Sequence, residues 1–589
     1  MSAARRALAG LALCAAACAP SPPVAAPVAP IAASSPVAQQ PPVASTAPAA
    51  AAPADARPDL TAEARVAIHE DRLEDALAAL QRALAAAPAD TPPGARLDAE
   101  LLLCAVLEPL GRRPEALQRL ATLPPCLGRQ LLLAVALAFT PGDAPRAEQL
   151  AALAPWDASP DDLSLAHLRE AWVEPLPSLA AATLACGVAD AAAAPGEPQR
   201  LRDAAARALQ WQALEARAAV DGLQDAPGEA AARRATAEAW ARGELPADEA
   251  LLDVMADDAG ALLLLCLPQS GAQVVPLEPS AELDKLATRA VEALRSEPLA
   301  RVADASAELA LALLPPAARE LLAPIPRWTL ILPDPFLGLP PTAWVMTPPD
   351  ADHPLRFLVE DHVLRLLPHV PGAPSPPAPA GARWLDVGQP AIAPDGVPAA
   401  RDAWTARYGP GVLGVAALPP LADATALTGA GATVPALRAA LPGSLGLRLG
   451  GPGAGAGPLG GVLLAPAAGA AGDEAGGLLT WSRLAQLPLP PVVLCDGTRF
   501  EPAEPSTGAD LAATALLSRS SDALLARWPE APTVRQATLR HVTERMTSGE
   551  TLELALTETL RDWLAKARPS AAEPPLHPRS WAAFLPYRR

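Results

Sequence analysis

Apolar residues in the first half of the chain recur at helical spacing. In one run, leucines follow one another at intervals of four, three and four residues before Pro88: Leu73, Leu77, Leu80, Leu84. Residues three and four apart share one face of a helix, and proline cannot continue it. The pattern predicts an amphipathic helix, and similar Ala- and Leu-rich stretches continue to residue 244.

Within residues 59–160 the helical pattern repeats. A small residue expected where two helices touch occurs at Ala76, Ala116 and Ala147, with a turn residue five positions before each. These spacings of 40 and 31 residues lie on either side of the roughly 34-residue tetratricopeptide repeat, and RLEDALAALQRALAAAP resembles the second half of that motif. Degenerate tetratricopeptide-like repeats are expected here, with a plain helical bundle as the alternative. Residues 161–244 are expected to form an Ala-rich helical region in which no period can be trusted.

From residue 245 short apolar runs replace the helical period. They occupy residues 261–267, 328–332, 363–367, 384–387, 445–449, 462–464, 492–495 and 524–526. Runs of this length, separated by helical stretches, are typical of strands in a sheet that is covered on both faces. Residues 245–589 are therefore predicted to be an α/β domain.

The amino terminus has the layout of an export signal. Arg5 and Arg6 precede an uncharged run over residues 7–17, which ends in three alanines before Cys18. Eleven residues are too few for a permanent bilayer span. The end of the run resembles a bacterial lipobox, which implies that residues 1–17 are a signal peptide and that Cys18 carries a lipid anchor to a membrane of the cell envelope. Ordinary signal cleavage, with secretion and an incidental Cys18, is the alternative; Cys14 is a weaker lipidation candidate.

Residues 18–58 are expected to form a disordered tether. Residues 19–54 carry no charge, and proline recurs throughout this stretch. Proline removes backbone donors and favours extended polyproline II conformations, so this stretch cannot build ladders of hydrogen bonds.

Charge and cysteine usage narrow the possible partners. The 64 acidic residues outnumber the 46 basic ones, for a net charge of -18, and a surface of that sign repels phosphate backbones. Nucleic-acid binding is therefore not expected.

Cysteines and histidines show no metal-ligand spacing, and GGPGAGAGPLGG (450–461) lacks the Gly-Lys-Ser/Thr of a phosphate loop. We expect no metal and no cofactor, and a flexible connection at the glycine-rich segment.

Several segments of the C-terminal half resemble, in order, the CHAT domain, a caspase-like cysteine-peptidase fold that typically follows tetratricopeptide repeats. They are RWTLILPDPFLGLPPTAWV (327–345), FLVEDHVLRLLPH (357–369), WLDVGQP (384–390), GATVPALRAAL (431–441), a strand-Trp-Pro segment with two helices (524–563) and HPRSWAAF (577–584). The resemblance implies a caspase-like fold over residues 245–589. It also implies that His577 and Trp581, in the terminal His-Pro-x-x-Trp motif, are structural.

The matched positions of the catalytic dyad hold neither a base nor a nucleophile. The family carries its two residues in His-x-x-x-His-Gly and Ser-Ala-Cys-Glu-Thr-Gly. Here the first motif matches LGLRLGGPGAG, with Arg448 at the first His and Pro452 at the catalytic one; the second matches VVLCDGTRF, with Gly497 at the nucleophile. A two-residue deletion would instead make Cys495 the thiol, but no histidine occurs between His369 and His541.

These observations predict an exported, lipid-anchored pseudopeptidase that binds a protein or peptide of the cell envelope. The alternative is an active caspase-like cysteine endopeptidase that uses Cys495 with a base brought from elsewhere. In either case, the strand ends at Leu449 and Leu494 are expected to be neighbours, since the dyad of this fold spans two adjacent strands.

Overall fold

The computed structural model describes residues 60–124 and 196–589, apart from gaps of which the longest are 391–420, 497–508, 373–381, 468–476 and 568–576, and a few isolated residues between 129 and 192. The chain divides into two compact units, Met1–Leu123 and Pro124–Arg589. The predicted signal peptide, the tether and Cys18 lie outside the described residues.

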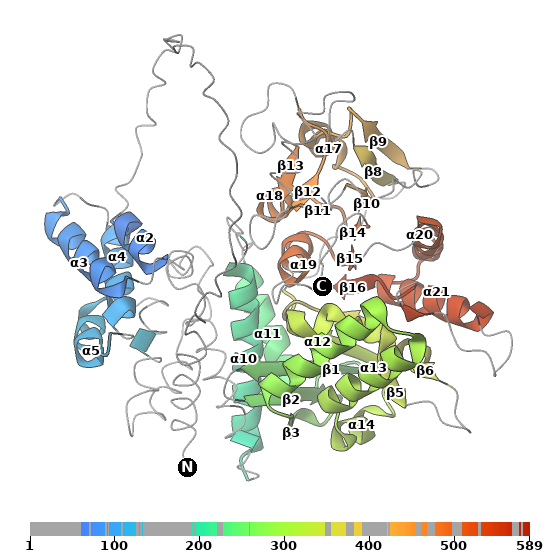
Figure 1. Ribbon diagram of the computed structural model, residues 1–589, viewed down its shortest axis with the longest axis horizontal. Coiled ribbons are helices and arrows are strands. Elements are labelled where there is room, and N and C mark those ends of the chain that lie inside the picture. Colours follow the sequence, from blue (N-terminus) through green and yellow to red (C-terminus); the bar gives the residue numbers. More distant parts are fainter. Residues whose placement is uncertain are drawn as a thin grey trace, which may run out of the picture. The chain divides into compact units, whose positions relative to one another are not determined.

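Four helices of the first unit are described, and each packs on the next along the chain (Figure 1, blue). Ala76 and Ala116 are fully buried, in agreement with their prediction as contact residues between helices. Gly111 adopts a left-handed conformation (φ 72°) between two of these helices, a backbone state that favours glycine. The predicted helix at residues 73–84 is confirmed. The four helices are α2 (Ala62–His69), α3 (Leu73–Ala86), α4 (Pro93–Leu107) and α5 (Arg113–Thr122).

The second unit is built on a mixed sheet of 11 strands, in the order β3-β2-β1-β4-β7-β16-β15-β14-β10-β8-β9. From β15 to β9 neighbouring strands are parallel, and β16 runs antiparallel to β15. The strands are β1 (Glu249–Asp257), β2 (Gly260–Leu267), β3 (Gly271–Pro276), β4 (Arg327–Ile331), β7 (Val363–Leu366), β8 (Trp384–Pro390), β9 (Thr425–Gly429), β10 (Gly446–Leu449), β14 (Val492–Cys495), β15 (Asp522–Ala526) and β16 (Phe584–Arg588). The predicted α/β character of this part of the chain is confirmed.

Seven of the eight predicted runs are strands of this sheet: β2, β4, β7, β8, β10, β14 and β15. The eighth, 462–464, falls in a separate three-stranded sheet formed by β11 (Gly453–Ala454), β12 (Gly461–Leu463) and β13 (Leu478–Thr480). Sequence patterns missed β1, whose apolar run is interrupted by buried Asp253, and β9, which is largely exposed. They also missed β3 and β16.

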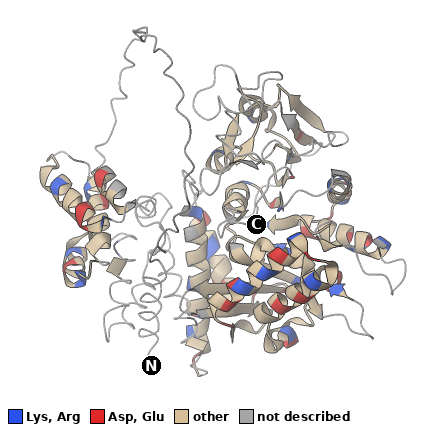
Figure 2. Ribbon diagram, viewed as in Figure 1, with Lys and Arg blue, Asp and Glu red and all other residues tan. Residues whose placement is uncertain are grey.

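Helices cover both faces of the sheet at its β1–β3 end. Leu251 and Met255 of β1 pack with α10 (Pro198–Ala218) and α11 (Glu229–Arg242), whereas Leu252 and Val254 face the cluster that includes α12 (Ser280–Ser296) and α13 (Leu299–Leu313). This alternation follows from the two-residue period of a strand. Figure 2 shows that charged residues are frequent on these helices, while most of the strand residues are uncharged.

Shorter elements and buried tryptophans such as Trp328 and Trp344 complete the second unit. The indole N–H groups of Trp328 and Trp344 donate to the carbonyls of Ile325 and Leu339, at 2.8 and 3.1 Å. Buried amphipathic groups keep their polar atoms satisfied in this way. The remaining elements are α14 (Pro316–Leu322), η2 (Asp334–Gly338), η3 (Pro341–Ala343), β5 (Val345–Thr347), β6 (Arg356–Phe357), α15 (Leu358–Asp361), α17 (Val434–Ala440), α18 (Trp481–Gln486), α19 (Ala509–Leu517), α20 (Pro532–Thr547) and α21 (Leu552–Ala567).

Glycines of the segment 450–461 permit close backbone contact. A Cβ atom on Gly451 would lie 2.2 Å from the carbonyl oxygen of Leu463, and one on Gly461 would lie 2.2 Å from that of Leu479. Both described ends of the segment therefore lie in or beside the three-stranded sheet, and the expectation of a flexible connection is wrong for these ends. Residues 455–460 lie outside the described part.

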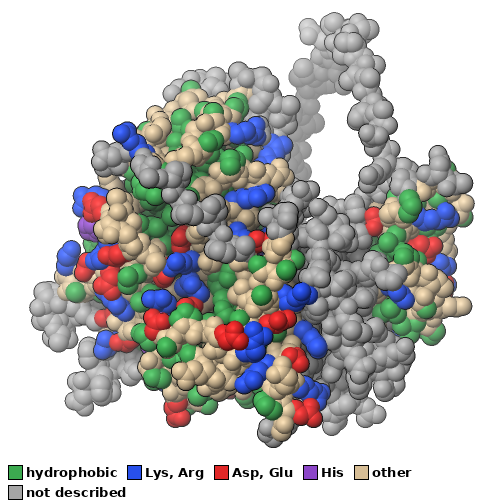
Figure 3. All heavy atoms as spheres, turned by 180° about the vertical axis from the view of Figure 1, so that it is seen from behind, with side chains coloured by type: hydrophobic (Ala, Val, Ile, Leu, Met, Phe, Trp, Pro, Cys, Tyr) green, Lys and Arg blue, Asp and Glu red, His purple; other side chains and the backbone are tan. Residues whose placement is uncertain are grey.

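The surface of the second unit carries charges of both signs. On the face seen in Figure 3, acidic and basic side chains are interspersed among apolar ones rather than gathered by sign. None of the described helices combines the length and the apolar composition needed to cross a membrane.

Candidate functional site

The carboxyl ends of β8, β10 and β14 meet at one edge of the large sheet. These strands are parallel neighbours: Arg448 pairs with Asp386 on one side and with Leu494 on the other, and Leu449 pairs with Cys495. The expected adjacency of the strand ends at Leu449 and Leu494 is therefore confirmed. In open α/β sheets, ligands bind outside the carboxyl ends of the strands, so this edge is the first place to look for a site.

Arg448 is held at this edge by carboxylates from both flanking strands. Its Nη1 donates to Oδ2 of Asp386 at 3.0 Å, and its Nη2 donates to Oδ2 of Asp496 at 3.0 Å. The Nε atom adds a longer bond of 3.3 Å to Oδ1 of Asp496. A planar guanidinium presents several donors in fixed directions, which allows one arginine to bridge two carboxylates.

Two further groups extend this ion network. Nη1 of Arg535, on α20, donates to the backbone carbonyl of Asp496 at 3.2 Å, and the amide of Leu421 donates to Oδ2 of Asp386 at 2.6 Å. Asp386, Arg448, Asp496 and Arg535 are each at most 3% exposed. The network is therefore buried and contains equal numbers of carboxylates and guanidinium groups.

Burial and charge act in opposite directions on these groups. Burial raises the pKa of Asp386 above its ordinary value, although Arg448 and the Leu421 amide oppose that shift. Burial alone would lower the pKa of Arg448, but Asp496 and Asp386 outweigh it and the pKa is raised. Arg448 therefore stays charged. Oδ1 of Asp386 is buried and accepts no hydrogen bond from the described residues.

Cys495 lies on the opposite face of its strand from this network. Successive side chains of a strand alternate between faces, so Cys495 and Asp496 point to opposite sides of the sheet. The thiol is 0% exposed in the apolar core and is not in a disulfide. Burial raises its pKa far above the ordinary value, with a smaller contribution from Asp496. At neutral pH the group is a protonated thiol, whereas the thiolate is the nucleophilic form.

The other predicted positions of the dyad, Pro452 and Gly497, lie outside the described residues. The described histidine side chains contact residues outside the ion network. His362 stacks on Trp328, with ring centroids 4.0 Å apart, and His369 bonds to the Val370 carbonyl. His541 contacts Arg540, and His577 lies 3.2 Å from the carbonyl oxygen of Glu297.

Trp581 and His577 lie in the segment that leads into β16. Trp581 is 1% exposed and meets Phe357 edge to face, with ring centroids 5.0 Å apart. Its backbone amide donates to the Pro578 carbonyl at 3.1 Å. This contact joins the entry into β16 to the segment that begins at β6. The structural role of the two residues remains a prediction.

Most of the ion network was not predicted from the sequence. Arg448 and Cys495 align with family motifs, whereas no motif pointed to Asp386, Asp496 or Arg535. A signal was present, because Asp386 in WLDVG and Arg448 in LGLRLG interrupt apolar strand runs. Charged residues are almost never fully buried unless they are paired, so two such interruptions predict a pair without identifying the partners.

No cluster of potential metal ligands occurs among the described residues. No protein-family model matches the chain, and no curated protein matches it.

Proposed function

We propose that this protein is exported, anchored through a lipid on Cys18, and binds a protein or peptide of the cell envelope through a CHAT-type domain that does not hydrolyse its ligand. On this proposal residues 59–160 are degenerate tetratricopeptide-like repeats, and the domain at residues 245–589 has the caspase-like fold. The membrane is that of a bacterial cell envelope.

The environment of Cys495 and Arg448 carries the proposal. In a working dyad, an exposed thiol and an imidazole face one substrate at the ends of adjacent strands. Here the candidate thiol is fully buried. The position of the family's first histidine holds Arg448, which forms ion pairs with two carboxylates. Neither group can transfer a proton to or from a substrate in this arrangement.

One feature supports binding at the same edge. The ion network fixes the ends of β8, β10 and β14 relative to one another, so the edge is preorganised. Asp386 is itself buried, so its part in binding is to hold Arg448 and the ends of the three strands in place. The alternative function, an active endopeptidase that uses Cys495, requires the end of β14 to rearrange before the thiol can contact a substrate.

Incubation of the full chain with an immobilised peptide library tests both functions at once. We expect retention of a subset of peptides without cleavage, weakened by Asp386→Asn and unchanged by Cys495→Ala. A matched control is Cys266→Ala, which removes another buried thiol, on β2. Hydrolysis that Cys495→Ala abolishes and Cys266→Ala preserves would establish the peptidase instead.

A further inference from the structure

Asp253 is a buried carboxyl group that the proposed function does not use. It lies in the middle of β1, between β2 and β4, and is 0% exposed. Its side chain shares one face of the strand with Leu251 and Met255 and therefore points toward α10 and α11. An ionised carboxylate is costly in such an apolar layer unless cations or several donors compensate its charge.

Gln212 on α10 supplies one donor to this carboxyl group. Its Nε2 atom donates to Oδ1 of Asp253 at 3.0 Å. Oδ2 of Asp253 and Oε1 of Gln212 are both buried, and neither has a hydrogen-bond partner among the described residues. The two planar groups therefore share one hydrogen bond and leave one buried acceptor each unsatisfied. Buried polar atoms are normally paired, so this arrangement lacks a donor.

The neighbouring strands surround Asp253 with uncharged groups. The residues that pair with it, Leu264 on β2 and Ile331 on β4, are apolar. Cys266 on β2 faces the same layer, and burial, with a smaller contribution from Asp253, raises the pKa of its thiol far above the ordinary value. The thiol is therefore neutral and brings no positive charge to the carboxyl group.

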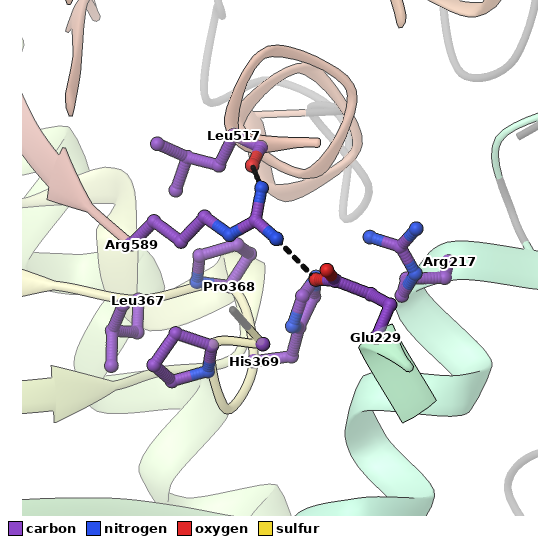
Figure 4. Close-up of a pocket in the computed structure, with 9 residues that line it drawn as sticks. Arg217, Glu229, Leu367, Pro368, His369, Leu517 and Arg589 are labelled. Atoms are coloured by element: carbon purple, nitrogen blue, oxygen red, sulfur yellow. Dashed lines mark hydrogen bonds and ion pairs between the residues drawn. The ribbon is translucent and has the colours of Figure 1, made fainter. Parts of the chain in front are cut away.

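The charged groups that share this side of the sheet are engaged elsewhere. Nearer the start of β1, Glu249 forms an ion pair with Arg365 of β7. Buried charges of α10 and α11 gather around His369 and Arg589 (Figure 4). Burial raises the pKa of Asp253 to about 7, and no charged side chain of the described residues is among the causes of that shift.

We propose that a proton on Oδ2 of Asp253 closes its pairing with Gln212 into a ring, which fastens α10 to β1 and opens when the proton is lost. In the ring the acid donates to Oε1 of Gln212, while the amide donates to Oδ1 of Asp253. The terminal torsions of both side chains have broad minima, so a small rotation brings the second pair of oxygens within bonding distance. One proton then satisfies both acceptors and leaves no charge in the apolar layer.

Loss of the proton reverses this balance. An ionised Asp253 places a carboxylate oxygen opposite the carbonyl oxygen of Gln212, with one hydrogen bond to compensate the charge. A carboxyl group exposed to water titrates near about 4, so the fastening is complete below that value and is lost as pH rises through about 7. A water molecule that donates to both oxygens is the competing arrangement, since it needs no proton on Asp253.

Infrared spectroscopy of the full chain detects the ring through the carbonyl stretch of the protonated acid. We expect a band at about pH 6 that Asp253→Asn removes and that disappears as pH rises through about 7. Gln212→Met removes the acceptor of the proton and should move the band to higher frequency, because a hydrogen-bonded acid absorbs at lower frequency than a free one. Absence of a band that depends on Asp253 overturns the proposal and assigns the two oxygens to a water bridge. A band that Gln212→Met leaves in place overturns the ring.

Hydrogen exchange of the full chain, followed by mass spectrometry and corrected for the intrinsic rate at each pH, tests the fastening of α10. In the wild type, the protection of α10 should fall at least about tenfold from about pH 5 to about pH 8, because the carboxyl group titrates lower once it is exposed. Asp253→Asn forms the same ring between two amides, so its protection should not depend on pH. Adding Gln212→Glu to that variant puts the acid on α10 and should restore the dependence.

The matched control comes from an exposed pair on the same helix. Nε2 of Gln199 donates to Oδ1 of Asp203 at 2.8 Å, and Asp203→Asn should change neither the infrared band nor the protection of α10. Wild-type protection of α10 that stays constant over this pH range overturns the fastening, and that comparison holds even if a variant does not fold. A double variant that folds but shows no pH dependence also counts against the ring.

Discussion

Arg448 and Cys495 lie on neighbouring parallel strands but point to opposite faces of the sheet. Arg448 shares its face with Asp386 and Asp496, whereas Cys495 shares its face with Leu449. Because successive side chains of a strand point to opposite faces, the sheet lies between these two groups although their strands are neighbours. The carboxyl edge therefore holds a closed ion network on one side and an apolar core with a buried thiol on the other.

We predict that Arg448→Met lowers the free energy of unfolding of the second unit by about 3–5 kcal/mol, because it leaves two buried carboxylates without their cation. Urea unfolding followed by tryptophan fluorescence measures the loss. The control Arg289→Met removes a half-exposed arginine that pairs with Glu308, and it should cost at most about 1 kcal/mol.

A second variant separates lost charge pairing from lost packing. Arg448→Met combined with Asp386→Asn and Asp496→Asn should recover much of the stability, since buried ion pairs can often be replaced by neutral groups. A triple variant no more stable than the single one would mean that packing of the arginine stem, rather than charge, accounts for the loss.

We predict that the Cys495 thiol reacts with iodoacetamide at least about 100-fold more slowly in the native protein than in urea, because burial removes access and raises its pKa. Mass spectrometry of labelled peptides assigns the rate to this residue. Ser296→Cys, at an exposed position on α12, provides a thiol that should label rapidly in both states. Rapid labelling of native Cys495 would instead favour the endopeptidase.

Asp253 should make the protein less stable as pH rises. Burial raises its pKa to about 7, despite the hydrogen bond from Gln212. A carboxyl group whose pKa is higher in the folded state than in the unfolded one contributes stability that is complete below the unfolded pKa of about 4 and is lost as pH rises through about 7. Asp253→Asn should therefore stabilise the protein by about 2–4 kcal/mol at pH near 8 and much less near pH 4.5.

Urea midpoints measured at both pH values check this prediction. Glu292→Gln, at an exposed position on α12, is the matched control and should change neither midpoint. A destabilising effect of Asp253→Asn at the higher pH would show that the carboxylate is compensated in the folded protein.

His369 should make the protein sensitive to acid. Its folded pKa is lowered to about 3, whereas an imidazole in the unfolded chain titrates near about 6.5. The stability it contributes is present above that unfolded value and is lost as pH falls from about 6.5 toward 3, by up to a few kcal/mol. His369→Gln should flatten the pH dependence of the urea midpoint over this range. A parallel curve for the variant would place the titration on other groups.

The lipid anchor gives a prediction for the intact cell. If Cys18 is acylated, the wild-type protein should sediment with the membrane fraction and Cys18→Ser should not, because the acyl chains supply the apolar surface that holds the chain there. The control Cys14→Ser should remain with the membranes, since that residue is removed with the signal peptide. Membrane retention of the Cys18 variant would disprove lipidation at this site.

Local sequence patterns determined the secondary structure well where burial is continuous. The leucine run in α3 is a helix and all eight apolar runs contain strands, because helix and strand periods depend on residues close in the chain. The same reasoning missed β1 and β9, whose residues do not form an uninterrupted apolar run. The patterns also located the candidate strand ends at Leu449 and Leu494.

Only the tertiary structure decided what lies at those ends. Arg448 meets Asp386 and Asp496, which are 62 and 48 residues away in the chain, and Arg589 meets Glu229 across 360 residues. The periodicity of the sequence cannot predict such pairings, because they depend on the order of the strands and the placement of the helices. The sequence alone could determine that a charge interrupts a buried strand. Which groups neutralise that charge, and which face the neighbouring thiol occupies, depend on the register of strands brought together by folding.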